Sequence, residues 1–211
     1  MTAALAATGA HVVAYEVDAG LVEILEREVA SLPNVEIRKR DASRIDLAGE
    51  LTDGPWTMVS NLPYNVGTGI VLDALRGAPD VVRFVVMIQH EVADRFLAKP
   101  GTRTYGVPSV VIGLHARGRL AFRVSPSVFV PPPRVGSAVV ELDRVPAPEG
   151  AESAIELAAA AFGQRRKMVR RSLTGVFADP DGALRAAGID PTSRAEVLSV
   201  DDYLALAGVA T

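Results

Sequence analysis

The chain has 211 residues, of which 49% are hydrophobic and 22% charged, with no cysteine and a formal net charge of −3. This composition excludes low-complexity disorder, collagen and disulfide-stabilised secreted scaffolds. No apolar run approaches the ~18 residues that cross a bilayer, and the apolar start, Met1 to Ala10, lacks the basic flank and cleavage pattern of a secretion signal. Three scattered histidines and no cysteine do not favour a metal site. We therefore expect a cytosolic protein with neither a metal nor a membrane partner.

Strands and helices are predicted to alternate through the first part of the chain. The runs 11–17, 35–38, 56–60 and 82–88 are typical of strands, and 19–30 and 70–75 of helices. This alternation predicts a doubly wound α/β sheet, in which the continuous apolar run 82–88 would be covered on both faces. Ligands bind such sheets at the carboxyl ends of the strands, where Glu16, Asp41 and Asn61 fall.

The second part of the chain has a different pattern. Residues 107–114 are β-branched and fit either a strand or a buried helix. Strands are predicted at 121–124 and 137–142, on either side of Pro131-Pro132-Pro133, which cannot join a ladder. Helices are predicted at 154–162, 167–176, 182–187, 193–198 and 200–206. We therefore expect an α/β domain over 1–145 and a small all-helical domain over 146–211.

Positive charge gathers in two runs despite the negative total. One run is Arg38-Lys39-Arg40, and the other places five cations in seven positions, Arg165, Arg166, Lys167, Arg170 and Arg171. Such runs are most often solvated helix faces, so they indicate a nucleic-acid contact only if other residues do.

The tetrapeptide Asn61-Leu62-Pro63-Tyr64 has a composition suited to one particular reaction. The exocyclic amine of a nucleobase is a poor nucleophile because its lone pair is delocalised into the ring. Two hydrogen-bond acceptors, the Asn61 side chain and the carbonyl of Leu62 or Pro63, could favour the tetrahedral nitrogen that attacks in line. Pro63 would stiffen the turn, and Tyr64 would stack on a flipped base. Taken alone, the tetrapeptide is equally compatible with an ordinary proline turn.

Two acidic residues at strand ends strengthen this interpretation. Glu16 could accept hydrogen bonds from ribose hydroxyls, and Asp41 from an adenine amine. Either acid alone would more often be solvated or cap a helix. Three strand ends in the right order are harder to obtain by accident.

These residues belong to motifs that resemble the ribosomal RNA adenine N6,N6-dimethyltransferases acting on the small subunit, and the resemblance runs along almost the whole chain. The motifs in the α/β part are Val13-Ala14-Tyr15-Glu16-Val17-Asp18, Arg40-Asp41-Ala42, Asn61-Leu62-Pro63-Tyr64-Asn65 and the segments 89–95, 99–101 and 105–106. The Pro-rich loop Phe129-Val130-Pro131-Pro132-Pro133-Arg134-Val135-Gly136-Ser137-Ala138-Val139 and the C-terminal segments 162–167 and 187–191 are the more specific ones.

The resemblance implies a Rossmann-like methyltransferase that uses S-adenosylmethionine. It implies that Glu16, Asp41, Ala42 and Asn61 bind this cofactor, and that Asn61, Leu62, Pro63, Tyr64 and Phe129 form the catalytic site, with Phe129 facing the target base. It also implies a helix over 108–117. The implied substrate is a pair of adjacent adenines in 16S rRNA, methylated during assembly of the small subunit.

RNA contacts are implied for one loop residue and for the C-terminal cation run. These residues are Arg134, Arg165, Arg166, Lys167, Arg170 and Arg171. We expect the protein to act as a monomer on the small-subunit precursor.

One family motif has no counterpart in the sequence. The family begins with a central strand and a loop of the form Glu-x-Gly-x-Gly-x-Leu-Thr, and Met1-Thr2 falls where Leu-Thr would stand. We therefore expect an N-terminally incomplete version of the enzyme. We also expect this chain to bind S-adenosylmethionine weakly or not at all.

Two alternatives stay open. One is dimethylation of large-subunit rRNA, which confers antibiotic resistance; Leu62 and the segment 164–167 favour the small subunit instead. The other is a non-catalytic RNA-binding assembly factor, which would have no use for the geometry of Asn61, Pro63 and Tyr64.

Overall fold

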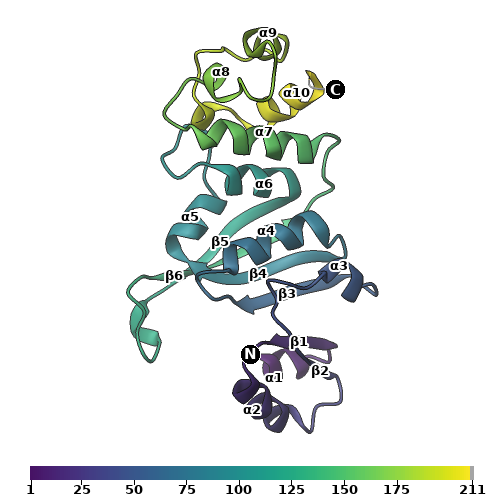
Figure 1. The fold of residues 1–211 in the computed structure, drawn as a ribbon. Helices are drawn as coiled ribbons and strands as arrows, with labels where there is room; N and C mark the ends of the chain where they lie inside the picture. Colours follow the sequence, from purple (N-terminus) through teal and green to yellow (C-terminus); the bar gives the residue numbers. More distant parts are fainter. Residues whose placement is uncertain (210–211) are drawn as a thin grey trace. The chain divides into compact units, whose positions relative to one another are not determined.

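The computed structural model describes residues 1–209, which divide into two compact units, one over Met1–Glu50 and one that begins at Leu51. Figure 1 shows the order of the elements along the chain. Within residues 1–209, no helix combines the length and the apolar character needed to cross a membrane, and no three His, Asp or Glu side chains gather as metal ligands would.

The first unit is built on a two-stranded parallel sheet of β1 (Val12–Glu16) and β2 (Val35–Lys39). The connecting helix α2 (Ala19–Val29) begins at Asp18, whose Oδ1 accepts from the amides of Gly20 and Leu21. These three elements confirm the predicted strand–helix–strand order. Two short helices, α1 (Thr2–Ala6) and α3 (Leu47–Glu50), lie outside the predicted elements.

The second unit contains a four-stranded sheet in the order β3–β4–β6–β5. The strands are β3 (Trp56–Asn61), β4 (Val81–Gln89), β5 (Ala116–Val124) and β6 (Ser137–Arg144). β3 runs parallel to β4, whereas β6 is antiparallel to both of its neighbours. The helices α4 (Gly67–Gly77), α5 (His90–Phe96) and α6 (Val107–His115) lie on one face of this sheet (Figure 1).

Within the second unit, one face of β4 is covered more fully than the other. Phe84, Val86 and Ile88 are buried, but the alternate residue Arg83 is exposed and Val85 is only half-buried. The helices of this unit shield one side of β4, so its side chains alternate in burial as they do in a sheet packed on one face.

The strands form two sheets where the alternating pattern predicts one. β1 pairs with β2 alone and β3 pairs with β4 alone within the described residues, so each is an edge strand.

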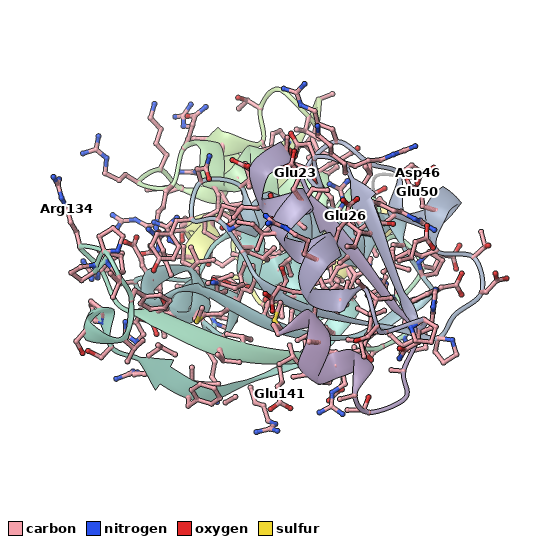
Figure 2. All side chains as sticks on the ribbon, turned by 90° about the horizontal axis from the view of Figure 1, so that it is seen from below. Glu23, Glu26, Asp46, Glu50, Arg134 and Glu141 are labelled. Atoms are coloured by element: carbon pink, nitrogen blue, oxygen red, sulfur yellow. The ribbon has the colours of Figure 1, made fainter. Side chains whose placement is uncertain are left out.

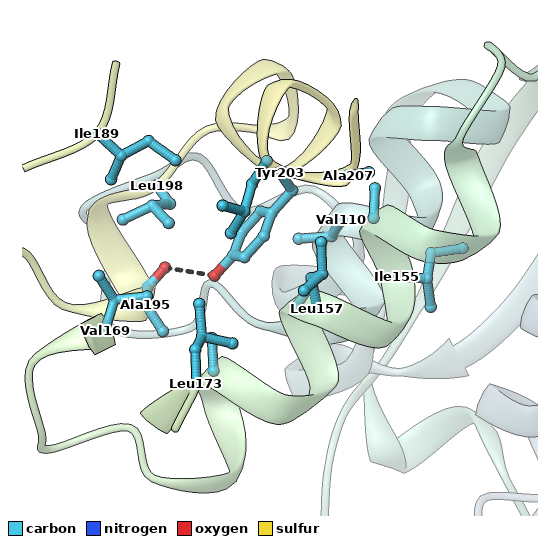
Figure 3. Packing of buried hydrophobic residues seen from close by; sticks show 14 of the residues in the cluster. Val110, Ile155, Leu157, Val169, Leu173, Ile189, Ala195, Leu198, Tyr203 and Ala207 are labelled. Atoms are coloured by element: carbon cyan, nitrogen blue, oxygen red, sulfur yellow. Dashed lines mark hydrogen bonds between the residues drawn. The ribbon is translucent and has the colours of Figure 1, made fainter. Parts of the chain in front are cut away.

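The C-terminal helices enclose a hydrophobic core. They are α7 (Ala151–Gly163), α8 (Val169–Ser172), α9 (Pro180–Ala186) and α10 (Val200–Val209). Tyr203 is fully buried there and donates to the Ala195 carbonyl at 3.0 Å (Figure 3). The same core includes Val110 and Leu114 of α6, so apolar packing continues across residue 146. The domain boundary at that residue stays a prediction.

Three segments of this part resolve or correct expectations. Residues 107–115 form α6, with Pro108 in its first turn, as the resemblance implies. The predicted helix 167–176 is wrong, because only Val169–Ser172 is helical. The predicted helix 193–198 is a single 3-10 turn, Ala195–Val197.

Candidate active site

The tetrapeptide identified in the sequence lies where β3 ends and the chain turns into α4. Asn61 is the last residue of β3, opposite Met87 of β4. The Leu62 amide donates to the Met87 carbonyl at 3.1 Å, and Leu62 is buried. Asn61 itself is exposed, and its side chain makes no hydrogen bond to any of residues 1–209. The loop is therefore anchored through Leu62 while the Asn61 amide stays available to a ligand.

The two carbonyls that follow Asn61 differ in their partners. The Pro63 carbonyl accepts from the amides of Val66 at 3.3 Å and Gly67 at 2.8 Å, at the start of α4. The Leu62 carbonyl accepts no hydrogen bond from the part of the chain that the structure describes. Because a carbonyl that already caps a helix is a poor acceptor for a ligand, the free pair at this strand end is the Asn61 side chain and the Leu62 carbonyl.

The first residue of α4 is packed directly against this loop. A Cβ placed on Gly67 would lie 2.8 Å from the Cβ of Leu62, closer than real Cβ atoms approach. Only glycine lets the helix begin so close to the buried leucine. The sequence alone does not indicate this role of Gly67, because it depends on the packing distance.

Tyr64 is tied to a residue of β6 at the same edge of the sheet. Its hydroxyl lies 2.7 Å from the Oγ of Ser137, the first residue of β6. Ser137 is 1% exposed, whereas Tyr64 is half-buried. Ser137 is thus a further residue at this site, one to which the sequence interpretation assigned no role although it lies in the Pro-rich motif.

Phe129 lies on the long loop between β5 and β6, which extends beyond the sheet (Figure 1). It follows the 3-10 turn Pro126–Val128 and is half-buried, and the next residue, Val130, is 98% exposed. No ring contact joins Phe129 to Tyr64 in the described part of the chain. The structure therefore does not bring the two predicted base-stacking rings together.

Arg134 lies on the same loop, five residues after Phe129. Its side chain extends away from the sheet (Figure 2) and has no ion-pair partner among residues 1–209. The loop ends where the Gly136 carbonyl accepts from the His90 amide at 2.9 Å. Arg134 thus lies on a loop whose C-terminal end is anchored to the start of α5.

The two predicted adenosine-binding acids share one edge of the first unit's sheet. Glu16 is opposite Lys39 in the parallel register, and the Arg40 amide donates to the Glu16 carbonyl at 3.0 Å, so Asp41 follows directly at the same edge. Oε1 of Glu16 accepts from the amides of Val17 and Asp18 at 2.8 and 2.9 Å. No hydrogen bond within residues 1–209 engages Oε2 of Glu16.

Asp41 is held in a tight turn of its own. Its Oδ1 accepts from the hydroxyl and the amide of Ser43 at 2.6 and 2.9 Å. The hydrogen bond from the Ser43 hydroxyl, and to a lesser degree the one from its amide, lower the pKa of Asp41, so the group is a carboxylate at neutral pH. The adjacent Ala42 is half-buried. Asn61, also predicted to contact the cofactor, belongs to the other unit.

The C-terminal cation run is not one helix face. The chain leaves α7 at Gly163 and turns before α8 begins at Val169. The guanidinium of Arg165 is bound within the protein. Its Nε donates to the Glu196 carboxylate at 3.0 Å, and a terminal nitrogen donates to the Arg103 carbonyl at 2.8 Å.

Arg170 lies 3.5 Å from the Asp181 carboxylate and is half-buried. The other members of the run are exposed and have no partner among the described residues; we call them the exposed cation cluster, Arg166, Lys167 and Arg171. The structure therefore divides the run into two residues that hold the fold and three that are free to meet an anion.

The Arg38-Lys39-Arg40 run is largely neutralised. Arg38 and Arg40 both pair with Glu50, at 3.1 and 2.6 Å, and Arg38 also pairs with Glu36 at 2.6 Å. This run adds little positive charge to the surface.

Comparison with known proteins identifies the family. The sequence model described as "Ribosomal RNA adenine dimethylase" matches residues 1–211. The chain belongs to this family. Its members include "Ribosomal RNA small subunit methyltransferase A" of Rubrobacter xylanophilus, which is 44% identical over 98% of this chain and 79% of that protein. The protein of the same name from Rhodospirillum rubrum is 43% identical over 98% of this chain and 73% of its own length.

Two solved structures share the fold. A dimethyladenosine transferase from Plasmodium falciparum matches 92% of this chain and 79% of its own, with a TM-score of 0.73 and 19% identity. The 23S rRNA methyltransferase ErmE matches 93% of this chain and 80% of its own, with a TM-score of 0.66 and 21% identity. The predicted α/β methyltransferase fold, the family and the enzyme class of rRNA adenine dimethyltransferases are thereby confirmed.

Proposed function

We propose that this protein transfers methyl groups from S-adenosylmethionine to the N6 amines of two adjacent adenines in small-subunit rRNA, in the cytosol, during ribosome assembly. The observation that carries the proposal is the pair of free acceptors at the carboxyl end of β3. Within residues 1–209, the exposed Asn61 side chain and the Leu62 carbonyl have no hydrogen-bond partner, whereas the Pro63 carbonyl accepts from the start of α4.

These two acceptors match the two N–H bonds of an exocyclic amine. Accepting both bonds holds the nitrogen in place and favours the tetrahedral geometry in which its lone pair can attack. Bound S-adenosylmethionine would supply an electrophilic methyl group activated by its own positive charge, so no general base is required to begin the reaction. Tyr64 would stack on the flipped base, and Phe129 would cover its other face once the loop after β5 closes on the RNA.

The adenosine half of the cofactor fits the carboxyl edge of the β1–β2 sheet. Oε2 of Glu16 can accept from ribose hydroxyls, and the ionised Asp41 can accept from the adenine amine beside Ala42.

The small subunit is the proposed target because the similar proteins from Rubrobacter xylanophilus and Rhodospirillum rubrum are named for it. Leu62 and the segment 164–167 favour the same subunit. The exposed cation cluster and Arg134 are the proposed contacts to the RNA backbone. We also propose that the helices after residue 146 carry most of this RNA contact, with the protein acting as a monomer.

The deciding experiment incubates the protein with small subunits that lack the modification and with labelled S-adenosylmethionine at millimolar concentration, so that weak cofactor binding does not limit methyl transfer. Methylated adenine in small-subunit rRNA supports the proposal, whereas methylation of large-subunit rRNA alone supports the antibiotic-resistance alternative. The Asn61→Ala variant should lose methyl transfer while retaining RNA binding, because the Asn61 side chain is exposed and makes no hydrogen bond within residues 1–209. RNA binding by the wild type without any methyl transfer would instead support a non-catalytic assembly factor.

A further inference from the structure

We infer that Ser137 is a positioning residue for the base-stacking tyrosine: its buried hydroxyl fixes the plane of the Tyr64 ring and joins the catalytic loop to the base of the Pro-rich loop. This inference rests on the proposed function, in which Tyr64 stacks on the target adenine. Its structural basis is the contact between the Tyr64 hydroxyl and the Ser137 Oγ at 2.7 Å.

Ser137 is held firmly in the sheet. It pairs with Gln89 of β4 on one side and with Val124 of β5 on the other, so its backbone lies within both ladders. The preceding residue, Gly136, is anchored through its carbonyl to the His90 amide at 2.9 Å. With 1% of its surface exposed, Ser137 offers its hydroxyl from a fixed point.

Tyr64, in contrast, lies in a turn outside both ladders. It is half-buried and forms no ring contact with another aromatic residue of the described chain. A half-buried ring can adopt more than one rotamer, and a hydrogen bond at its far end favours one of them. The hydroxyl provides that contact, which explains why the loop carries tyrosine: phenylalanine would stack on a base equally well but could not bond to Ser137.

The same serine connects the two proposed walls of the base pocket. Tyr64 reaches Ser137 through the hydrogen bond, and Phe129 precedes it by eight residues on the loop that ends at β6. Ser137 therefore ties the orientation of one ring to the anchor of the loop that carries the other. Loss of its hydroxyl should loosen the alignment of the base without removing either ring.

The test is a double-mutant cycle with Ser137→Ala, Tyr64→Phe and the double variant. In methyl transfer to small subunits at saturating RNA, each single variant should lower kcat about five- to tenfold, a loss on the scale of one hydrogen bond. The double variant should be no slower than the singles, and KM for the RNA should change less than twofold (about 0.4 kcal/mol) because neither ring is removed. A matched control is Ser172→Ala, which removes another buried hydroxyl, one without a hydrogen-bond partner, and should leave kcat unchanged.

Urea unfolding of the same four proteins tests the bond apart from the proposed function. The losses of unfolding free energy in the two single variants should not add up in the double variant, since each substitution removes the same contact. Because Tyr64 is only half-buried, Tyr64→Phe should still fold, and the bond can be tested with this variant if Ser137→Ala folds poorly. Additive losses in unfolding would overturn the inference, as would an unchanged kcat in Tyr64→Phe. If the unfolding cycle shows coupling and no protein transfers methyl groups at millimolar S-adenosylmethionine, the proposed function fails and the positioning role falls with it.

Discussion

The contact between Gly67 and Leu62 makes a testable link between helix packing and the proposed chemistry. In a Gly67→Ala variant, the new Cβ would lie 2.8 Å from the Cβ of Leu62. Both atoms are attached directly to the backbone, so neither can rotate away. Either α4 or the loop must move by several tenths of an ångström.

The expected cost combines two opposing contributions. Overpacking of a buried contact costs about 1–3 kcal/mol, and replacing a helical glycine by alanine returns up to about 1 kcal/mol. We therefore expect Gly67→Ala to lower the free energy of unfolding by roughly 0.5–2 kcal/mol. Because the Leu62 carbonyl is one of the two proposed acceptors, we expect kcat to fall as well. The loss would reach about 100-fold if the carbonyl were displaced by ~1 Å.

The same helix offers a matched control. Gly69 lies two residues further on, is exposed, and would have nothing within 4 Å of an added Cβ. Gly69→Ala should stabilise the protein by roughly 0.5–1 kcal/mol and leave kcat unchanged. Urea unfolding and labelled methyl transfer measure the two quantities. If Gly67→Ala is as stable and as active as Gly69→Ala, the close packing of α4 does not shape the catalytic loop.

Other predictions concern stability and RNA binding. Arg144→Lys should lower the free energy of unfolding by about 2–4 kcal/mol in urea titrations, since lysine cannot reproduce the hydrogen bonds of the Arg144 guanidinium. That group donates to four carbonyls, those of Ala74, Leu75, Ala78 and Val81. Burial lowers the pKa of His115 below its ordinary 6.5, so on acidification the unfolded chain takes up a proton at this site before the folded one does. The free energy of unfolding should therefore fall as the pH drops through about 6.5. His115→Gln should remove this part of the pH dependence, and an unchanged profile in that variant would contradict the assignment. Replacing the exposed cation cluster with alanine should flatten the salt dependence of RNA binding by about three units of slope, whereas Arg165→Ala should mainly reduce stability.

The strands and helices with a strong local pattern were predictable, and those decided by distant contacts were not. The helix α2 shows both its cap, Asp18, and its apolar face in the sequence. The helix α6 does not, because its β-branched residues favour a strand locally. What makes the segment helical is its burial, with Val110 and Leu114 packed into the core of the C-terminal helices.

The short helix α8 shows the opposite error. The sequence from 167 to 176 has helical spacing, but Met168 forms a bridge with Arg194, and the Val169 amide donates to the Ser193 carbonyl at 2.7 Å. A partner 26 residues away therefore holds the chain extended just before the helix begins. No local pattern contains that information.

The candidate site divides in the same way. The chemistry of Asn61, Glu16 and Asp41 was predictable, because acids and amides at strand ends are visible in the sequence. The choice between the Leu62 and Pro63 carbonyls was not, since it depends on which one caps α4. The role of Ser137 was hidden for the same reason: 73 residues separate it from Tyr64.

Each contact that shapes the catalytic loop comes from within the second unit. Leu62 is fixed by Met87 of β4, the start of α4 packs on it through Gly67, and Tyr64 is held by Ser137 of β6. None of these contacts uses Glu16 or Asp41. The geometry proposed to orient the target amine is thus set independently of the residues proposed to hold the cofactor, so a loss of cofactor affinity should abolish methyl transfer while leaving the alignment of the base and the binding of RNA intact.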